Sequence, residues 1–382
     1  MIESIFDVLE TVFAFDIPDL LNTILFTLIG IVFGSRVTNH INTLRSVSGQ
    51  PPIMIRGGRG MWRRQPLRPA RNTAPPELTN THQPTPKDCA DVKSIMAHVA
   101  NFPPELVDIV MDFAEYWACS VAAIDYSVTA QDGSGERKVL GGHGREDQFL
   151  LRTEPVGLTT WHAENKEGWQ SEAPPRRLGA EYSRPELERF VEGPPSSLEH
   201  PFRKVVFDIT SHDQGWSAEV ADHNTFRPAY TWFDAGVDRF DKSHACSDSC
   251  EANASSSTRK VPTTCAIRPI WPMLEESEGS VNSEAGYHHE LHAAGAHRIQ
   301  CNRHADRNWQ HHHVEWSSTD EIDPDSTAAV ALVENGRGHA TGDGSFVRNL
   351  KVGDMVTIWG RARYAGWVNH VQKIEVRVYW AL

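Results

Sequence analysis

Apolar and polar residues alternate with a period of two along the second half of the chain, and this pattern constrains the fold more than any other feature. The clearest stretches are residues 204–211, 355–359 and 374–380. Strands that are separated by turns, without helices alternating between them, are typical of antiparallel sheets packed face to face. The sequence therefore predicts a mainly β protein, with a β-sandwich or jelly-roll-like domain over residues 138–382.

Three further segments have different compositions. Residues 162–198 are rich in Glu, Pro and Arg, and residues 242–296 are rich in Ser, His, Glu and Ala, so both are expected to be partly disordered insertions. Before the sandwich, residues 93–125 are expected to form a helical pair, because apolar residues recur at helical spacing after Pro103 and Pro104.

The N-terminal region contains an uncharged apolar stretch from Leu20 to Gly34, with five acidic residues before it and eight arginines after it. We expect residues 1–40 to form a membrane anchor, consisting of an amphipathic helix followed by a single transmembrane helix at about 18–37. The arginines predict that the large C-terminal part is cytosolic. A cleaved signal peptide and a buried helix remain alternatives. Residues 41–92, rich in Arg and Pro, are expected to be a disordered tether.

Charge and cysteine content exclude several classes of protein. The formal net charge is −13, with −5 in residues 1–34 and +8 in residues 35–76, which leaves −16 for the remainder. An acidic body argues against nucleic-acid binding. Membrane lipid is the expected partner of the apolar N-terminal helix and of the arginines that follow it. Six cysteines are too few for a disulfide framework in 382 residues. No phosphate-binding loop or nucleophile elbow is present, and no cofactor is expected.

The most distinctive motif is Ser211-His212-Asp213-Gln214-Gly215-Trp216, directly after a predicted strand. Polar side chains beside a tryptophan at the edge of a sandwich can bind a protein or a carbohydrate. The predicted binding residues are His212, Asp213, Gln214, Trp216 and Trp232. In the alternative interpretation, the motif is a strand-ending turn whose polar groups satisfy the backbone. A hydrolase that uses His212 and Asp213 as acid and base is a further alternative.

Histidines cluster between residues 288 and 313, but their spacing does not predict a metal site. A zincin needs His-Glu-x-x-His, whereas His292 follows His289 and Glu290 one residue too soon. Alternation along a strand places adjacent histidines of residues 311–313 on opposite faces. The cysteines match no zinc-finger spacing. We therefore predict neither metal ligands nor catalytic residues.

Several segments together resemble a widespread group of fungal proteins that have no established activity. They are Pro103 to Trp117, the motif of residues 211–216, Thr341 to Trp359, and Gly366 to Trp380. The resemblance implies a fungal origin and a β-rich domain with a tryptophan-rich C-terminus, and it supplies no catalytic residue. The Pro-Pro-Glu-Leu sequence at residues 103–106 also resembles the start of an F-box, which implies a ubiquitin-ligase adaptor as an alternative function.

Overall fold

The computed structural model describes residues 83–130, 133–142, 146–157, 198–241, 267–275, 286–289 and 295–382. The predicted membrane anchor lies outside these residues, as do the tether up to residue 82 and most of the two predicted insertions. Within the described ranges, no helix combines the length and the apolar character that crossing a membrane requires.

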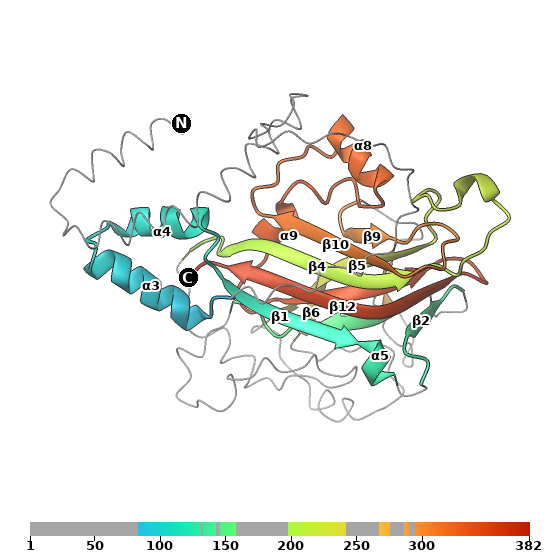
Figure 1. The fold of residues 1–382 in the computed structure, drawn as a ribbon, viewed down its shortest axis with the longest axis horizontal. Coiled ribbons are helices and arrows are strands. Elements are labelled where there is room, and N and C mark those ends of the chain that lie inside the picture. The colour runs from blue at the N-terminus through green and yellow to red at the C-terminus, as the bar shows by residue number, and fades with distance from the viewer. Residues whose placement is uncertain are drawn as a thin grey trace, which may run out of the picture. The chain divides into compact units, whose positions relative to one another are not determined.

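Two five-stranded antiparallel sheets form the domain (Figure 1). The first sheet has the order β1, β12, β4, β10, and β2 also pairs with β12. Its strands are β1 (Ala118–Asp125), β2 (Arg137–Leu140), β4 (Phe202–His212), β10 (Gln310–Ser317) and β12 (Val368–Trp380). The mainly β prediction is confirmed.

The second sheet has the order β3, β11, β5, β6, and β9 also pairs with β5. Its strands are β3 (Asp147–Arg152), β5 (Thr231–Phe240), β6 (Ile267–Trp271), β9 (Arg298–Cys301) and β11 (Met355–Ala362). A separate hairpin consists of β7 (Leu274–Glu275) and β8 (Gly286–Tyr287). The chain passes from one sheet to the other between β2 and β3, between β3 and β4, and between β4 and β5. It passes again between β9 and β10, between β10 and β11, and between β11 and β12.

The hydrophobic core contains the inward-facing residues of both sheets. In β4, Val205, Phe207 and Ile209 form the apolar face expected from the sequence and are fully buried in the core cluster, whereas Val206 between them is buried outside that cluster. They belong to the same cluster as Phe233 of β5 and Ile358 of β11, which come from the other sheet. Burying each such side chain contributes roughly 1.5–3 kcal/mol, so this layer is the main source of stability.

The described helices are mostly short. They are α3 (Pro86–His98), α4 (Pro104–Phe113), α5 (Tyr126–Thr129), η2 (Val220–Asp222), α8 (Thr327–Glu334) and α9 (Ser345–Arg348). Helix α3 begins inside the segment predicted as tether, because Thr85 and Asp88 form a capping box at its start. Helices α3 and α4 lie at one end of the first sheet, and the loop with η2 lies at the other end (Figure 1).

Two predicted boundaries require correction. Residues 118–125 were expected within the helical pair, but they form β1, whose whole length pairs with β12. This segment has weak alternation, and its pairing partner lies more than 240 residues away, so tertiary context decides its conformation. Residues 267–271 fall within the second predicted insertion, but they form β6 and pair with β5.

Candidate functional site

One end of the sandwich presents aromatic side chains, which we call the aromatic rim: Trp216, Tyr230, Trp309, Tyr364 and Trp367. Trp216 is 67% exposed, Tyr364 47% and Trp309 43%. The ring of Tyr230 lies edge-on to Trp367 at 4.7 Å and to Tyr364 at 5.3 Å. Each rim residue lies just outside a strand at this end of the sandwich. Trp216 follows β4, Tyr230 precedes β5, Trp309 precedes β10, and Tyr364 and Trp367 lie between β11 and β12.

Asp213 lies beneath the rim and is almost completely buried, with 1% of its surface exposed. One carboxylate oxygen accepts a hydrogen bond from the Ala305 amide at 2.7 Å, and the other accepts one from the Thr231 hydroxyl at 3.1 Å. Burial raises the pKa of Asp213 to about 6, against the opposing effect of these hydrogen bonds. Asp213 therefore links the loop that contains Ala305 to the start of β5.

A buried amide network continues this link across both sheets. Ser211 Oγ donates to Asn302 Oδ1 at 2.7 Å, and Asn302 Nδ2 donates to Asn369 Oδ1 at 2.9 Å. Asn369 Nδ2 in turn donates to the carbonyl oxygens of Trp232 and Arg361, both at 3.2 Å. Because Ser211 and Asn369 belong to the first sheet and Trp232 and Arg361 to the second, the network holds the two sheets together at this end.

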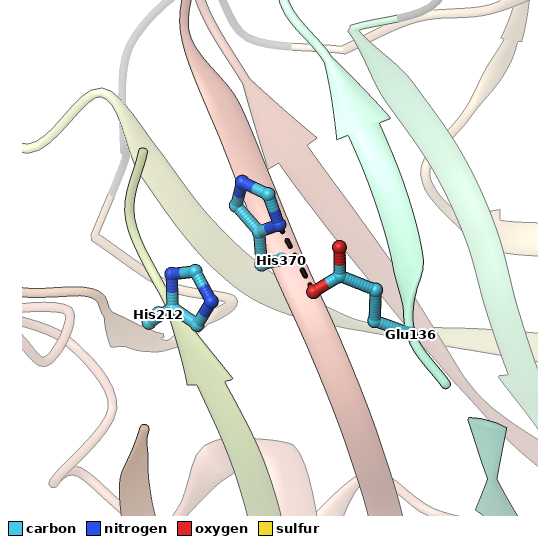
Figure 2. Close-up of side chains that lie close together, drawn as sticks. All are labelled: Glu136, His212 and His370. Carbon is cyan, nitrogen blue, oxygen red and sulfur yellow. Dashed lines mark hydrogen bonds and ion pairs between the residues drawn. The ribbon is translucent and has the colours of Figure 1, made fainter. Parts of the chain in front are cut away.

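His212 lies on the outer face of the first sheet, opposite His370 in the β4–β12 pair. Their rings are stacked, with centroids 4.3 Å apart and an angle of 14° between the planes. The Trp309 ring makes an edge-to-face contact with His212, with centroids 4.4 Å apart. His370 Nδ1 donates to Glu136 Oε2 at 3.1 Å (Figure 2). His212 Nδ1 lies 2.6 Å from the Asp213 carbonyl oxygen and therefore carries the proton.

Burial and neighbouring charged groups change the pKa values of His370 and Glu136. Burial lowers the pKa of His370, and the adjacent His212 lowers it further. Burial works against the charged form of Glu136, but hydrogen bonds from Lys138 and His370 outweigh it, so the pKa of Glu136 is lowered. The arrangement favours a neutral imidazole beside a charged carboxylate.

The structure separates the five predicted binding residues. His212, Gln214 and Trp216 lie at the rim, where Gln214 accepts a hydrogen bond from the Val368 amide at 3.3 Å and donates to the Trp216 carbonyl oxygen at 3.1 Å. Asp213 is buried below them. Trp232 is buried on the second sheet, with the Arg363 guanidinium 5.0 Å above its ring.

The motif does not form an acid–base pair that faces a substrate. Both oxygens of Asp213 are occupied, and only its backbone carbonyl contacts the His212 ring. The geometry therefore favours the structural interpretation for Asp213.

Charged residues that no sequence pattern indicated form ion pairs in the second sheet. Arg361 Nη1 lies 2.7 Å from Asp147 Oδ1, and Arg361 Nη2 lies 2.7 Å from Asp234 Oδ2. Arg363 Nη1 also contacts Asp147 Oδ1 at 2.8 Å. Asp147, Asp234 and Arg361 lie in three strands that are distant in sequence, and Arg363 follows the last of them, so no local motif could have indicated the group.

The histidines of β10 alternate as the sequence predicts. His311 and His313 point to one side, where both contact Asp208 Oδ1, at 3.3 and 2.8 Å. His312 points to the other side and is buried, which lowers its pKa to about 4. The three rings do not converge.

No protein-family model, curated protein or solved structure matches the chain.

Replacement of Asp213 by alanine tests its role in the scaffold. Asp213→Ala should lower the free energy of unfolding by about 3 kcal/mol, because the Ala305 amide and the Thr231 hydroxyl lose their buried acceptor. Gln214→Ala, at the next position but half-buried, should cost less than about 1 kcal/mol. Urea unfolding followed by tryptophan fluorescence measures both values. Equal stability of Asp213→Ala and wild type would show that the carboxylate is not structural.

Proposed function

We propose that the domain is a carbohydrate-binding module and that the aromatic rim contacts the ligand. The observation that carries the proposal is the exposure of Trp216, Trp309 and Tyr364 at one end of the sandwich, above a network that fixes the underlying backbone. Flat aromatic faces pack on the apolar faces of sugar rings, while amide and imidazole groups orient the hydroxyls. Gln214 and His212 supply such groups beside the rim.

Two further observations favour a neutral sugar. The charge of −16 on the region after residue 76 disfavours polyanions such as nucleic acids. The strand orders β1-β12-β4-β10 and β3-β11-β5-β6, with β9 also paired to β5, support a jelly roll, an architecture that includes lectin domains. Fold by itself does not determine function, so the exposed rings remain the principal support.

Substitutions at the rim test carbohydrate binding directly. An array of neutral glucan, chitin and mannan oligosaccharides should identify a ligand. Calorimetry should show at least about tenfold weaker binding for Trp216→Ala and for Trp309→Ala, because each variant removes an aromatic face on which a sugar ring packs. Trp216→Ala should retain wild-type stability, because this side chain is 67% exposed. Trp309→Ala loses the contact with His212, so circular dichroism should establish that this variant is folded.

The matched control is Phe113→Ala, which removes an exposed aromatic ring from α4 at the opposite end of the sandwich. This variant should bind the sugar as wild type does. Absence of binding to the whole array, or undiminished binding by the double variant Trp216→Ala/Trp309→Ala, would exclude the rim as a carbohydrate site.

We also propose that the chain is attached to a membrane by residues 18–37, with the β domain in the cytosol. Support comes from the uncharged stretch Leu20–Gly34 and from the arginines that follow it.

Alkaline carbonate extraction of membranes tests this attachment. The full-length chain should remain in the membrane pellet, and a chain lacking residues 1–36 should be released, because only the former carries the apolar stretch. Release of both chains would rule out a transmembrane anchor.

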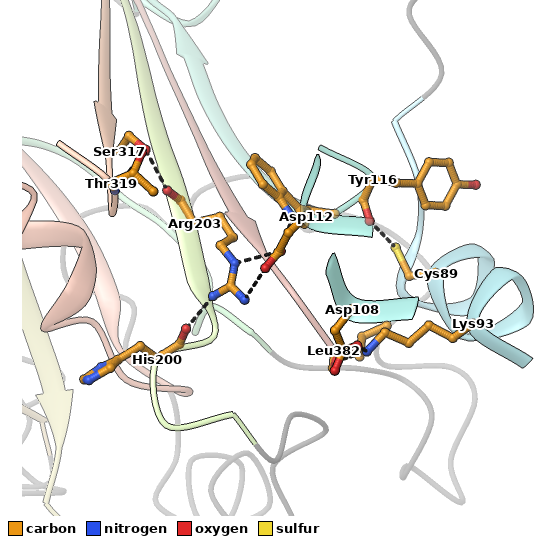
Figure 3. A network of polar contacts seen from close by, with 11 residues as sticks. Cys89, Lys93, Asp108, Asp112, Tyr116, His200, Arg203, Ser317, Thr319 and Leu382 are labelled. Atoms are coloured by element: carbon orange, nitrogen blue, oxygen red, sulfur yellow. Dashed lines mark hydrogen bonds and ion pairs between the residues drawn. The ribbon is translucent and has the colours of Figure 1, made fainter. Parts of the chain in front are cut away.

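A ubiquitin-ligase adaptor is a second candidate function, because the helical pair has an exposed apolar surface. Ile95 and Val99 of α3 and Ile109 and Phe113 of α4 are all largely exposed. The buried side of α4, which carries Val107 and Met111, packs on the core. Beside it, Arg203 binds the Asp112 carboxylate with two hydrogen bonds of 2.9 and 3.0 Å (Figure 3).

The sandwich is held to the helices at a second point. Lys93 Nζ donates to the Leu382 carbonyl oxygen at 2.6 Å and lies 2.5 Å from Asp108 Oδ1 (Figure 3). These contacts hold the helical pair in a defined orientation on the sandwich, with Ile95, Val99 and Ile109 among its exposed residues.

Binding of the purified ligase scaffold subunit tests the adaptor function. Wild type should bind the scaffold subunit in calorimetry, and Phe113→Asp should bind at least about tenfold more weakly, because a charge would be buried in an apolar contact. Trp216→Ala, at the far end of the domain, is the control and should bind normally. Failure of wild type to bind would dismiss the adaptor.

A further inference from the structure

We infer that Glu136, His212 and His370 form a binding site for a divalent transition-metal ion, with Zn²⁺ as the expected occupant. One ligand atom from each of these side chains lies within 4.8 Å of the other two. Two imidazoles and one carboxylate form a donor set that suits zinc and related ions. The inference shares His212 with the proposed carbohydrate site, but it rests on a separate observation, the convergence of these three ligand atoms.

The fold brings these residues together from three strands or their ends. His212 is the last residue of β4, His370 lies in β12, and Glu136 immediately precedes β2. Because β12 pairs with β4 on one side and with β2 on the other, all three side chains reach the same region of the first sheet (Figure 2).

An irregularity in β12 determines the direction of His370. Val371 pairs with Ser211 and Lys373 with Thr210, so Gln372 is an extra residue in the strand. Before this bulge the buried positions are odd, Asn369 and Val371, and after it the fully buried apolar positions are even, Ile374, Val376 and Val378. Without the bulge, the His370 side chain would point into the core and would not lie beside His212 on the outer face. Bulges commonly redirect side chains at functional sites.

His212 is already oriented as a ligand. Its Nδ1 proton is donated to the Asp213 carbonyl oxygen at 2.6 Å, which leaves Nε2 with its lone pair. Metal-binding histidines usually have such a hydrogen bond from the second ring nitrogen. The edge of Trp309 also packs on the ring and limits its rotation.

Binding of the ion requires a small rearrangement. Tetrahedral zinc with bonds near 2.0–2.1 Å places its ligand atoms about 3.3 Å apart, so the three residues must approach one another. The stacked rings cannot both direct lone pairs at one ion until the His370 ring tilts. Tilting breaks the 3.1 Å bond to Glu136 and frees that carboxylate as the third ligand.

A neighbouring cation competes for the same carboxylate. Lys138 Nζ lies 3.1 Å from Glu136 Oε1, but half of the lysine side chain is exposed, so it can move into solvent when the ion binds. Three protein ligands leave one position of a tetrahedral ion for water or another small ligand.

The test uses the full chain, stripped of metal with a chelator, and measures Zn²⁺ binding by competition with a chromophoric chelator. Wild type should bind one more Zn²⁺ ion per chain than His370→Gln does. Glu136→Gln should weaken binding of that ion at least about tenfold. The control variant His313→Gln makes the same substitution on β10, outside the cluster, and should retain the ion.

Cobalt provides a second readout that does not depend on stoichiometry. Co²⁺ added to wild type should give visible absorption typical of four-coordinate nitrogen and oxygen ligation, and His370→Gln should lose it. Circular dichroism establishes that each variant is folded, and Glu136→Gln, which lies outside the strands, serves if His370→Gln unfolds. Equal Zn²⁺ binding by wild type and folded Glu136→Gln, or absence of binding by wild type, would overturn the inference.

Discussion

The pairing of β12 determines the geometry of the first sheet and of the rim. This strand of 13 residues contacts β4 along one side and both β1 and β2 along the other. Its N-terminal part carries Asn369 into the buried amide network and His370 to the outer surface. A shift of one residue in this pairing would exchange the two faces, so that the network would lose an amide and the core would gain an imidazole.

Burial of so many polar groups below the rim is costly unless each one is paired. Asn302 and Asn369 satisfy one another and also contact Ser211, Thr231 and two backbone carbonyls, so the desolvation cost is offset by hydrogen bonds. A network of fixed directionality specifies one arrangement of the two sheets more strictly than apolar contacts do. This rigidity allows the exposed rings above it to keep their positions without being buried themselves.

The sequence predicts the strands whose alternation is regular. The prediction is wrong for segments whose conformation depends on pairing with a strand distant in sequence. Residues 204–211 and 374–380 are strands as expected, because one face of each is apolar. The weakly patterned β1 was assigned to the helical pair, and β6 was assigned to an insertion. In both cases the hydrogen-bonding partner, and not the local composition, determines the conformation.

The same reasoning explains which site residues could be identified. The motif around His212 can be identified from the sequence because its polar residues are adjacent. Its Trp216 is exposed, as a binding residue should be. Trp232 has no feature in the sequence that distinguishes it from Trp216, but it is buried. Glu136 and His370 could not be selected, because extending the alternation of residues 374–380 back to His370 places its side chain in the core. Only the bulge at Gln372 reverses that direction, and a single extra residue leaves no compositional signal.

The two ends of the sandwich differ in chemistry in a way that follows from this construction. The helical pair closes one end through ion pairs at partly exposed positions, such as Arg203 with Asp112, and presents aliphatic side chains outward. The rim closes the other end through buried hydrogen bonds of amide, hydroxyl and carboxylate groups, and it presents aromatic rings and imidazoles. An apolar helical face suits a protein partner, while rings beside polar groups suit a hydrated small ligand. Because no strand end is shared between these surfaces, a partner at one end can bind without displacing a ligand at the other.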